Sequence, residues 1–115
     1  LVVVLGHEAC GAVSAALNPQ LLLTPSLSQV VGQLRMELLQ YGEHLSLEES
    51  CRRHTLSAAA NLVHSSVLLT DRVRAGHLAV VAGYYDLHSS AIDWMGHVEP
   101  IRYPGPAQAS ISRQP

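Results

Sequence analysis

The chain opens with an uninterrupted run of aliphatic residues, LVVVL at positions 1–5, followed by a glycine and a mixed polar segment. Continuous apolar runs rich in β-branched residues are typical of strands buried on both faces, as in parallel sheets. Gly6 permits a sharp turn, and the small residues over 10–17 predict a short helix that ends near the Asn-Pro pair at 18–19. This opening therefore predicts a strand–turn–helix unit.

Two amphipathic helices follow, each indicated by apolar residues at spacings of three and four. The first runs from Pro25 to about Tyr41, where Gly42 closes it. Its apolar stripe consists of Leu27, Val30, Val31, Leu34, Leu38 and Leu39. The second begins with a capping box, in which Ser46 accepts from the amide three residues on and Glu49 reaches back. Its predicted buried face holds Cys51, Leu56, Ala59, Ala60, Leu62 and Val63.

A second strand lies further along the chain. Residues 64–66 are expected to interrupt the long helix, and residues 67–74 to form a short helix of their own. The segment 77–85 contains LAVVAGYY, a second buried strand. Residues 86–90 can then form a turn and residues 91–94 a short antiparallel return.

The order of these elements predicts an α/β fold with a central, mostly parallel sheet flanked by helices. The helical stretch serves as the crossover between two parallel strands. Periodicity fades after Met95, and residues 98–115 are expected to be an extended or disordered tail. We therefore expect one domain over residues 1–97, followed by that tail.

Composition narrows the function classes. The length of 115 residues suits a single domain. Charged residues make up 14% of the chain, the net charge is -2 and there is no basic run, which argues against a nucleic-acid binder. No apolar stretch reaches the ~18 residues that a membrane span needs. The two cysteines lie far apart and form no disulfide framework, which favours the cytoplasm or another reducing compartment. Because the sequence starts inside a strand and without Met, we expect it to be a fragment.

The chemistry of the first turn depends on His7 and Cys10, three positions apart at the end of the first strand. Sites in parallel sheets form beyond the carboxyl ends of strands, and a helix N-terminus favours a thiolate at Cys10. Imidazole and thiolate suit Zn²⁺, with bonds of ~2.0–2.1 Å and ~2.3 Å. On spacing alone, a core-edge histidine beside a buried thiol is favoured over a metal site.

No other histidine or cysteine has a spacing that completes a metal-ligand set. The histidines with no suitable partner are His44, His54, His64, His88 and His97, and His77 is expected at the surface. Cys51 precedes Arg52 and Arg53 in an amphipathic helix, and we interpret it as a buried structural thiol.

Two separated motifs resemble the β-class carbonic anhydrases. The first is V-L-G-H-x-x-C-G-[AG]-V, which begins at Val4 and resembles the second zinc motif of that family. The second, from Asn61 to Trp94, resembles its later helix, its strand ending in Y-D-L and the following hairpin. Together the resemblance covers about residues 1–94.

The resemblance implies an incomplete β-carbonic-anhydrase-like fold and zinc-dependent, reversible hydration of carbon dioxide to bicarbonate. It implies that His7 and Cys10 are metal ligands. It also implies that Gly11 lines the active site and that Tyr85, which precedes Asp86 as in the family, borders the active-site cleft or a subunit contact. An ordinary core tyrosine fits Tyr85 at least as well.

The resemblance also predicts what this chain lacks. The family's first zinc motif, C-x-D-x-R, does not occur in these residues, so no catalytic residue is expected within the chain. We expect that motif in a preceding segment and expect the isolated chain to be inactive. The exposed flank of the sheet would need a partner, and a homodimer or higher homo-oligomer is implied.

Two alternatives stay open. The first is a non-catalytic domain that retains the fold for interaction or oligomerisation. The second is a nucleophilic or redox protein in which Cys10 acts with His7 as its base.

Overall fold

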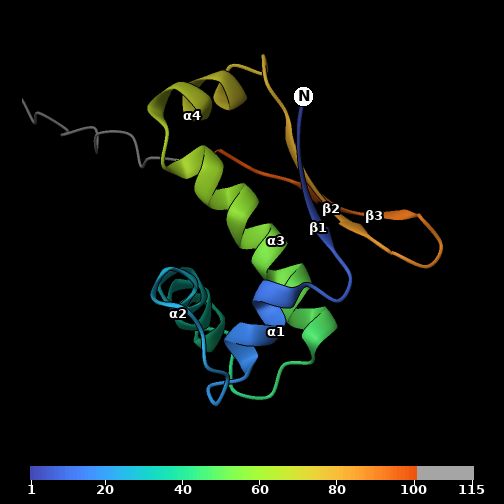
Figure 1. Cartoon of the computed structure of the whole chain (residues 1–115). Helices are drawn as coiled ribbons and strands as arrows, with labels where there is room; N and C mark the ends of the chain where they lie inside the picture. Colours follow the sequence, from blue (N-terminus) through green and yellow to red (C-terminus); the bar gives the residue numbers. More distant parts are fainter. Residues whose placement is uncertain (101–115) are drawn as a thin grey trace, which may run out of the picture.

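The computed structural model describes residues 1–100 (Figure 1). In order, its elements are β1 (Val2–His7), α1 (Gly11–Leu17), α2 (Pro25–Leu39), α3 (Leu47–His64), α4 (Val67–Arg74), β2 (Val80–Tyr85) and β3 (Ile92–His97). The predicted elements are all present, and β3 extends three residues beyond the predicted return. The first strand also runs two residues further, so His7 is its last residue rather than the start of a loop.

Within the described residues the strands form one sheet in the order β1-β2-β3. β1 and β2 are parallel, with Val2 opposite Val80 and His7 opposite Tyr85. β2 and β3 are antiparallel, with an irregularity next to Gly83. The α1–α4 stretch is the predicted crossover between parallel strands. The α/β class is confirmed, with one parallel and one antiparallel pairing.

The helices lie to one side of this sheet, and α3 runs along it in contact with β1 and β2 (Figure 1). Side chains alternate along β1, so Val2 and Val4 are half-buried towards α3 while Val3 and Leu5 are 42% and 48% exposed. The prediction that the first strand is buried on both faces is therefore wrong for the described chain, because no helix among residues 1–100 covers the second face. β1 also forms an edge of the sheet, as the predicted exposed flank requires.

The buried face of α3 differs from the prediction. Leu56 and Leu62 are 44% and 39% exposed. The buried positions are Ser50, Cys51, Thr55, Ala59 and Val63. Four of these are spaced by four residues, which keeps them in one row facing the sheet. Leu56 and Leu62 lie beside that row, because the surface of two strands, β1 and β2, is too narrow to cover a wider face of α3.

Of the two hydrogen bonds in the predicted capping box, the structure forms the one that Ser46 accepts. Ser46 Oγ accepts from the backbone N–H of Glu49 at 3.1 Å, which satisfies one free amide at the start of α3. The Glu49 carboxylate lies instead 3.7 Å from Arg53, one turn along the helix. Thr24 and Ser66 cap α2 and α4 in the same way.

Two further expectations concern the C-terminal tail and membrane-spanning segments. Most of the expected tail, residues 101–115, lies outside the described residues. Among residues 1–100, no helix combines the length and the apolar character needed to cross a membrane.

Candidate metal centre

His7 and Cys10 lie at the two ends of the turn that joins β1 to α1. His7 ends the strand, and Cys10 is the N-cap residue of α1, with its carbonyl accepting from Ser14 N at 2.9 Å. The Cys10 side chain makes no capping hydrogen bond. Ala9, just before it, has a φ of +52°, the left-handed conformation that lets the chain reverse here. The Cys10 sulfur is therefore not occupied by the helix it starts.

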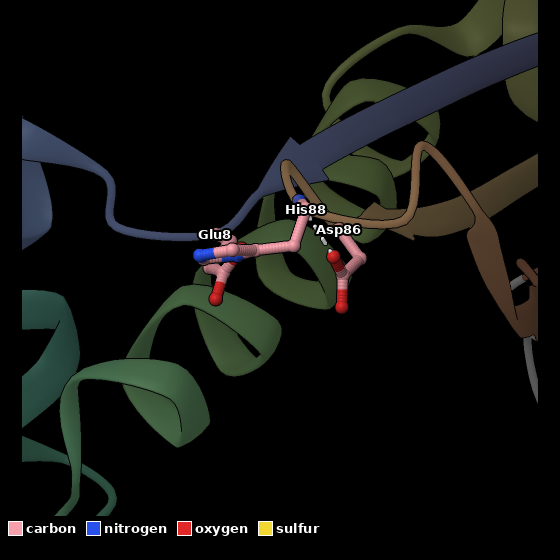
Figure 2. A group of neighbouring side chains, drawn as sticks. All are labelled: Glu8, Asp86 and His88. Atoms are coloured by element: carbon pink, nitrogen blue, oxygen red, sulfur yellow. Dashed lines mark hydrogen bonds and ion pairs between the residues drawn. The ribbon is translucent and has the colours of Figure 1, made fainter.

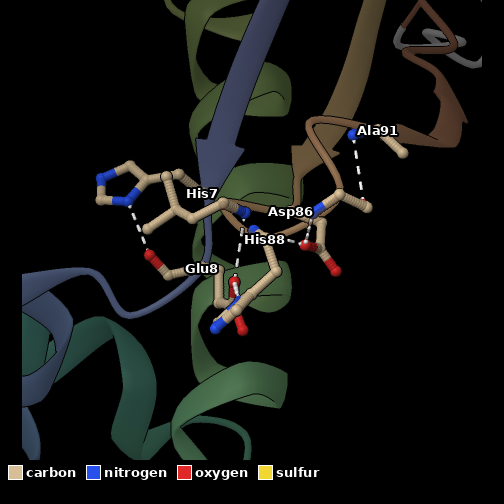
Figure 3. Close-up of polar contacts among 7 residues, drawn as sticks. His7, Glu8, Asp86, His88 and Ala91 are labelled. Atoms are coloured by element: carbon tan, nitrogen blue, oxygen red, sulfur yellow. Dashed lines mark hydrogen bonds and ion pairs between the residues drawn. The ribbon is translucent and has the colours of Figure 1, made fainter.

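The His7 ring is held in one tautomer. Its Nδ1 lies 2.9 Å from the carbonyl oxygen of Glu8, and a carbonyl can only accept, so Nδ1 carries the proton (Figure 3). In the neutral form of the ring, the lone pair is then on Nε2, and the side chain is exposed. A ring N–H donated to a backbone carbonyl is the usual way in which a metal-binding histidine is oriented.

The two side chains have different surroundings. His7 follows Val3 and Leu5 on the open face of β1, whereas Cys10 is half-buried against the apolar cluster that contains Cys51 and Tyr84. Among residues 1–100, no third histidine, cysteine or carboxylate forms a three-ligand group with either of them. That both bind one ion stays a prediction.

The expected lining residues flank this turn. Tyr85 is the last residue of β2 and lies opposite His7 in the parallel register, half-buried. Gly11 is the first residue of α1, and apart from its chain neighbours and the backbone of α1 no atom lies within 4 Å of the position that a Cβ would occupy there. The space in front of Gly11 is therefore open.

Two buried groups lie beneath the turn. Cys51 is 2% exposed, and burial raises the pKa of its thiol, while the backbone N–H of Cys10 opposes that shift. Cys51 is thus the buried thiol that the sequence predicts. Tyr84 is 4% exposed, its pKa is raised chiefly by burial, and its hydroxyl has no hydrogen-bond partner among the described residues. Buried hydroxyls usually have a hydrogen-bond partner, and water in the adjoining space is sufficient to supply one here.

A polar pocket of about 360 Å³ adjoins Tyr84. The Arg52 guanidinium lies 4.1 Å from the centre of the Tyr84 ring and bridges the carboxylates of Asp93 at 2.6 Å and Glu48 at 3.1 Å. The pocket also includes Glu8, so it reaches the turn that carries the predicted ligands.

Sequence reasoning missed one cluster, formed by Glu8, Asp86 and His88 (Figure 2). Glu8 Oε2 accepts from Leu87 N at 3.1 Å and from His88 Nδ1 at 3.0 Å. These bonds account for the close approach of the side chains without an ion. Glu8 and His88 are 80 residues apart, and only the parallel pairing of β1 with β2 brings them together.

The turn that carries His88 is stiffened by Asp86. Its Oδ1 accepts from the backbone N–H groups of His88 at 2.8 Å and Ser89 at 2.9 Å, and its own N–H donates to Ala91 O at 3.0 Å (Figure 3). The Ser89 amide, then the His88 amide, lower the pKa of the Asp86 carboxyl. The Glu8 carboxylate is therefore bound to a well-ordered turn.

The His88 imidazole is expected to titrate above the ordinary histidine pKa, because Glu8 accepts from it and adds negative charge, to which Asp86 contributes. The raised pKa means that the contact stabilises the fold below the unfolded-state pKa and loses this effect as the pH rises through the folded value. An NMR titration should show the His88 pKa falling in Glu8→Gln and unchanged in Glu99→Gln. Equal values in wild type and Glu8→Gln would contradict the contact.

Comparisons with known proteins place this geometry in context. A family model described as "Carbonic anhydrase" matches residues 1–92. Two curated proteins named Carbonic anhydrase 2, from two strains of Mycobacterium tuberculosis, are 34% identical over 103 residues, which is 85% of this chain and 50% of each of theirs. The chain thus spans about half the length of the curated relatives it matches.

Solved structures agree on the fold. A tetrameric β-carbonic anhydrase from Sordaria macrospora matches with a TM-score of 0.66 and 20% identity, over 82% of this chain and 51% of that one. The β-carbonic anhydrase CcaA matches with a TM-score of 0.63 and 20% identity, over 87% and 52% of the two chains.

Proposed function

This chain belongs to the β-class carbonic anhydrase family, and from that premise we propose that the complete protein uses zinc to hydrate carbon dioxide reversibly to bicarbonate. His7 Nε2 and Cys10 Sγ are two of its metal ligands in this proposal. The observation that carries it is the hydrogen bond from His7 Nδ1 to the Glu8 carbonyl, because it engages Nδ1 and so leaves Nε2 as the ring nitrogen that can reach an ion at a strand end.

The donor set fits zinc. A neutral imidazole and a thiolate are the ligands that Zn²⁺ prefers, and the start of α1 lowers the cost of a negative sulfur at Cys10. When bound, zinc lowers the pKa of a coordinated water to about 7, which supplies a nucleophile for carbon dioxide at neutral pH. The chain's own residues orient the proposed ligands. The Glu8 carbonyl holds the His7 ring, and Tyr85 lies opposite His7 in the strand register.

A tetrahedral zinc site needs further protein ligands. Since no third donor among residues 1–100 groups with His7 or Cys10, those ligands come from another part of the complete protein or from a second copy. The C-x-D-x-R motif of the family is the donor segment we propose. The partly exposed Gly6–His7 end of β1 lies at the sheet edge, where an added strand would approach both ligands.

A second candidate function is an interaction or oligomerisation domain. It is favoured by the outer edge of β1, which pairs with no strand among residues 1–100, and by the apolar side chains on the open face of the sheet. Those side chains are Leu1, Val3, Leu5, Ile92 and Trp94. The Sordaria relative is described as tetrameric, and we propose that this chain also assembles into a homo-oligomer through such surfaces.

The two functions are separated by measuring zinc per chain and carbon dioxide hydration in the complete protein and in the 115-residue chain alone. An enzyme predicts one zinc per chain and hydration activity in the complete protein, both lost on chelation and restored by zinc. An interaction domain predicts neither, with oligomers still seen by light scattering. Full zinc occupancy in a monomer of the short chain would contradict the shared ligand set.

A further inference from the structure

We propose that Glu8 is a positioning residue for the metal centre: its carboxylate fastens the His7–Cys10 turn to the turn after β2. The inference rests on the proposed zinc site, because it concerns how the chain presents His7 and Cys10 to the ion. Glu8 lies between the two proposed ligands but offers neither of the donor atoms assigned to zinc.

The main chain of Glu8 makes the first two connections. Its N–H donates to the carbonyl of Tyr85 at 3.0 Å, which extends the pairing of β1 with β2 by one residue. Its carbonyl accepts from His7 Nδ1 at 2.9 Å and so selects the ring tautomer. The orientation of the His7 ring therefore depends on where the peptide group of Glu8 lies.

The side chain makes the next two connections. Both end on the same oxygen, Oε2, which accepts from Leu87 N at 3.1 Å and His88 Nδ1 at 3.0 Å (Figure 3). The Glu8 side chain is only 33% exposed, whereas that of His88 is 87% exposed. Leu87 donates from the main chain, so the backbone of the turn fixes the position of this donor, and His88 adds a side-chain contact from the solvent side.

The turn needs such an anchor because its own conformation is unfavourable. Ala9 has a φ of +52°, which a residue with a Cβ seldom adopts unless its neighbours hold it there. Cys10 lends no side-chain cap to α1. The turn at Asp86, to which the Glu8 carboxylate is hydrogen-bonded, is stabilised by its own hydrogen bonds. It therefore gives the strained turn at Ala9 a fixed point of attachment.

The test uses the complete protein with Glu8→Ala and Glu8→Gln. Glutamine keeps an acceptor oxygen for Leu87 and His88, so it should retain zinc affinity within about threefold, whereas alanine should lose about 10–100-fold, as for other outer-shell partners. Affinity is measured by competition with a chelator. The absorption spectrum of the cobalt-substituted protein and the NMR signal of the His7 Nδ1 proton report the geometry directly.

Glu99→Ala is the matched control, since Glu99 also pairs with a histidine, His97 at 2.7 Å, away from this turn. It should change neither affinity nor spectrum. Wild-type affinity and spectrum in Glu8→Ala would overturn the inference while leaving the zinc site intact. Glutamine as damaging as alanine would also overturn it, because charge rather than hydrogen bonding would then matter. A wild-type protein without zinc would overturn this inference and the proposed function together.

Discussion

His7→Ala and Cys10→Ser are each expected to weaken zinc binding and carbon dioxide hydration severely in the complete protein. In the proposed site, His7→Ala removes one donor of a four-coordinate ion and Cys10→Ser replaces a thiolate with a weakly binding hydroxyl, and loss of an outer-shell partner alone already costs about 10–100-fold in affinity. We therefore expect a loss of more than about 100-fold in zinc affinity, measured by metal content and chelator competition, together with a matching loss of initial hydration rate.

Two substitutions of the same chemical kind serve as controls. His44→Ala removes an exposed histidine outside the metal turn, and Cys51→Ala removes the buried thiol that packs beside Tyr84. Both variants should retain one zinc per chain, because alanine is a tolerable replacement for a small buried thiol. If Cys51→Ala lost zinc and Cys10→Ser kept it, the assignment of the sulfur ligand would be wrong.

Among the glycines at positions 1–100, Gly6 is the one whose replacement by alanine is expected to lower the free energy of unfolding most. A Cβ at Gly6 would lie 1.7 Å from Thr55 Oγ1 and 2.9 Å from Thr55 Cβ. Thr55 cannot move aside, since it is 3% exposed and its hydroxyl donates to Cys51 O at 2.8 Å. Overpacking of this kind costs about 3 kcal/mol or more, to be measured by urea denaturation.

The reason lies in how closely β1 approaches α3. The same methyl group at Gly32, in the middle of α2, meets no atom within 4 Å, so Gly32→Ala should stabilise by about 0.5–1 kcal/mol. The double variant Gly6→Ala with Thr55→Ala removes the Oγ1 contact but keeps the Cβ contact, and should recover part of the loss. A fully stable Gly6→Ala variant would show that β1 and α3 are not packed as described.

Gly6 also connects packing to the proposed function. It is the residue before His7, so the close contact with Thr55 sets how far the end of β1 lies from α3. A variant that folds with β1 displaced would move His7 relative to Cys10, whose helix packs on α2 and α3. Zinc affinity in the double variant would then fall even where stability is partly recovered.

The sequence by itself determined the elements and the candidate chemistry. Hydrophobic runs and spacings located β1, β2 and the helices, and local signals such as Ser46 at a helix start were correct, because capping and periodicity depend on residues within one or two turns. The H-x-x-C motif and the later Y-D-L strand were sufficient to suggest the family, which the comparisons support independently.

Only the tertiary structure decided which surfaces are covered and which distant residues meet. The run at positions 1–5 is equally apolar on both faces, so its composition could not reveal that one face lies on α3 and the other is open. Leu56 and Leu62 were assigned to the core by periodicity, yet the extent of the sheet beneath α3 leaves them exposed. The contact of Glu8 with His88 follows from strand register, a long-range property that no local pattern encodes, because it is set by packing between segments 80 residues apart.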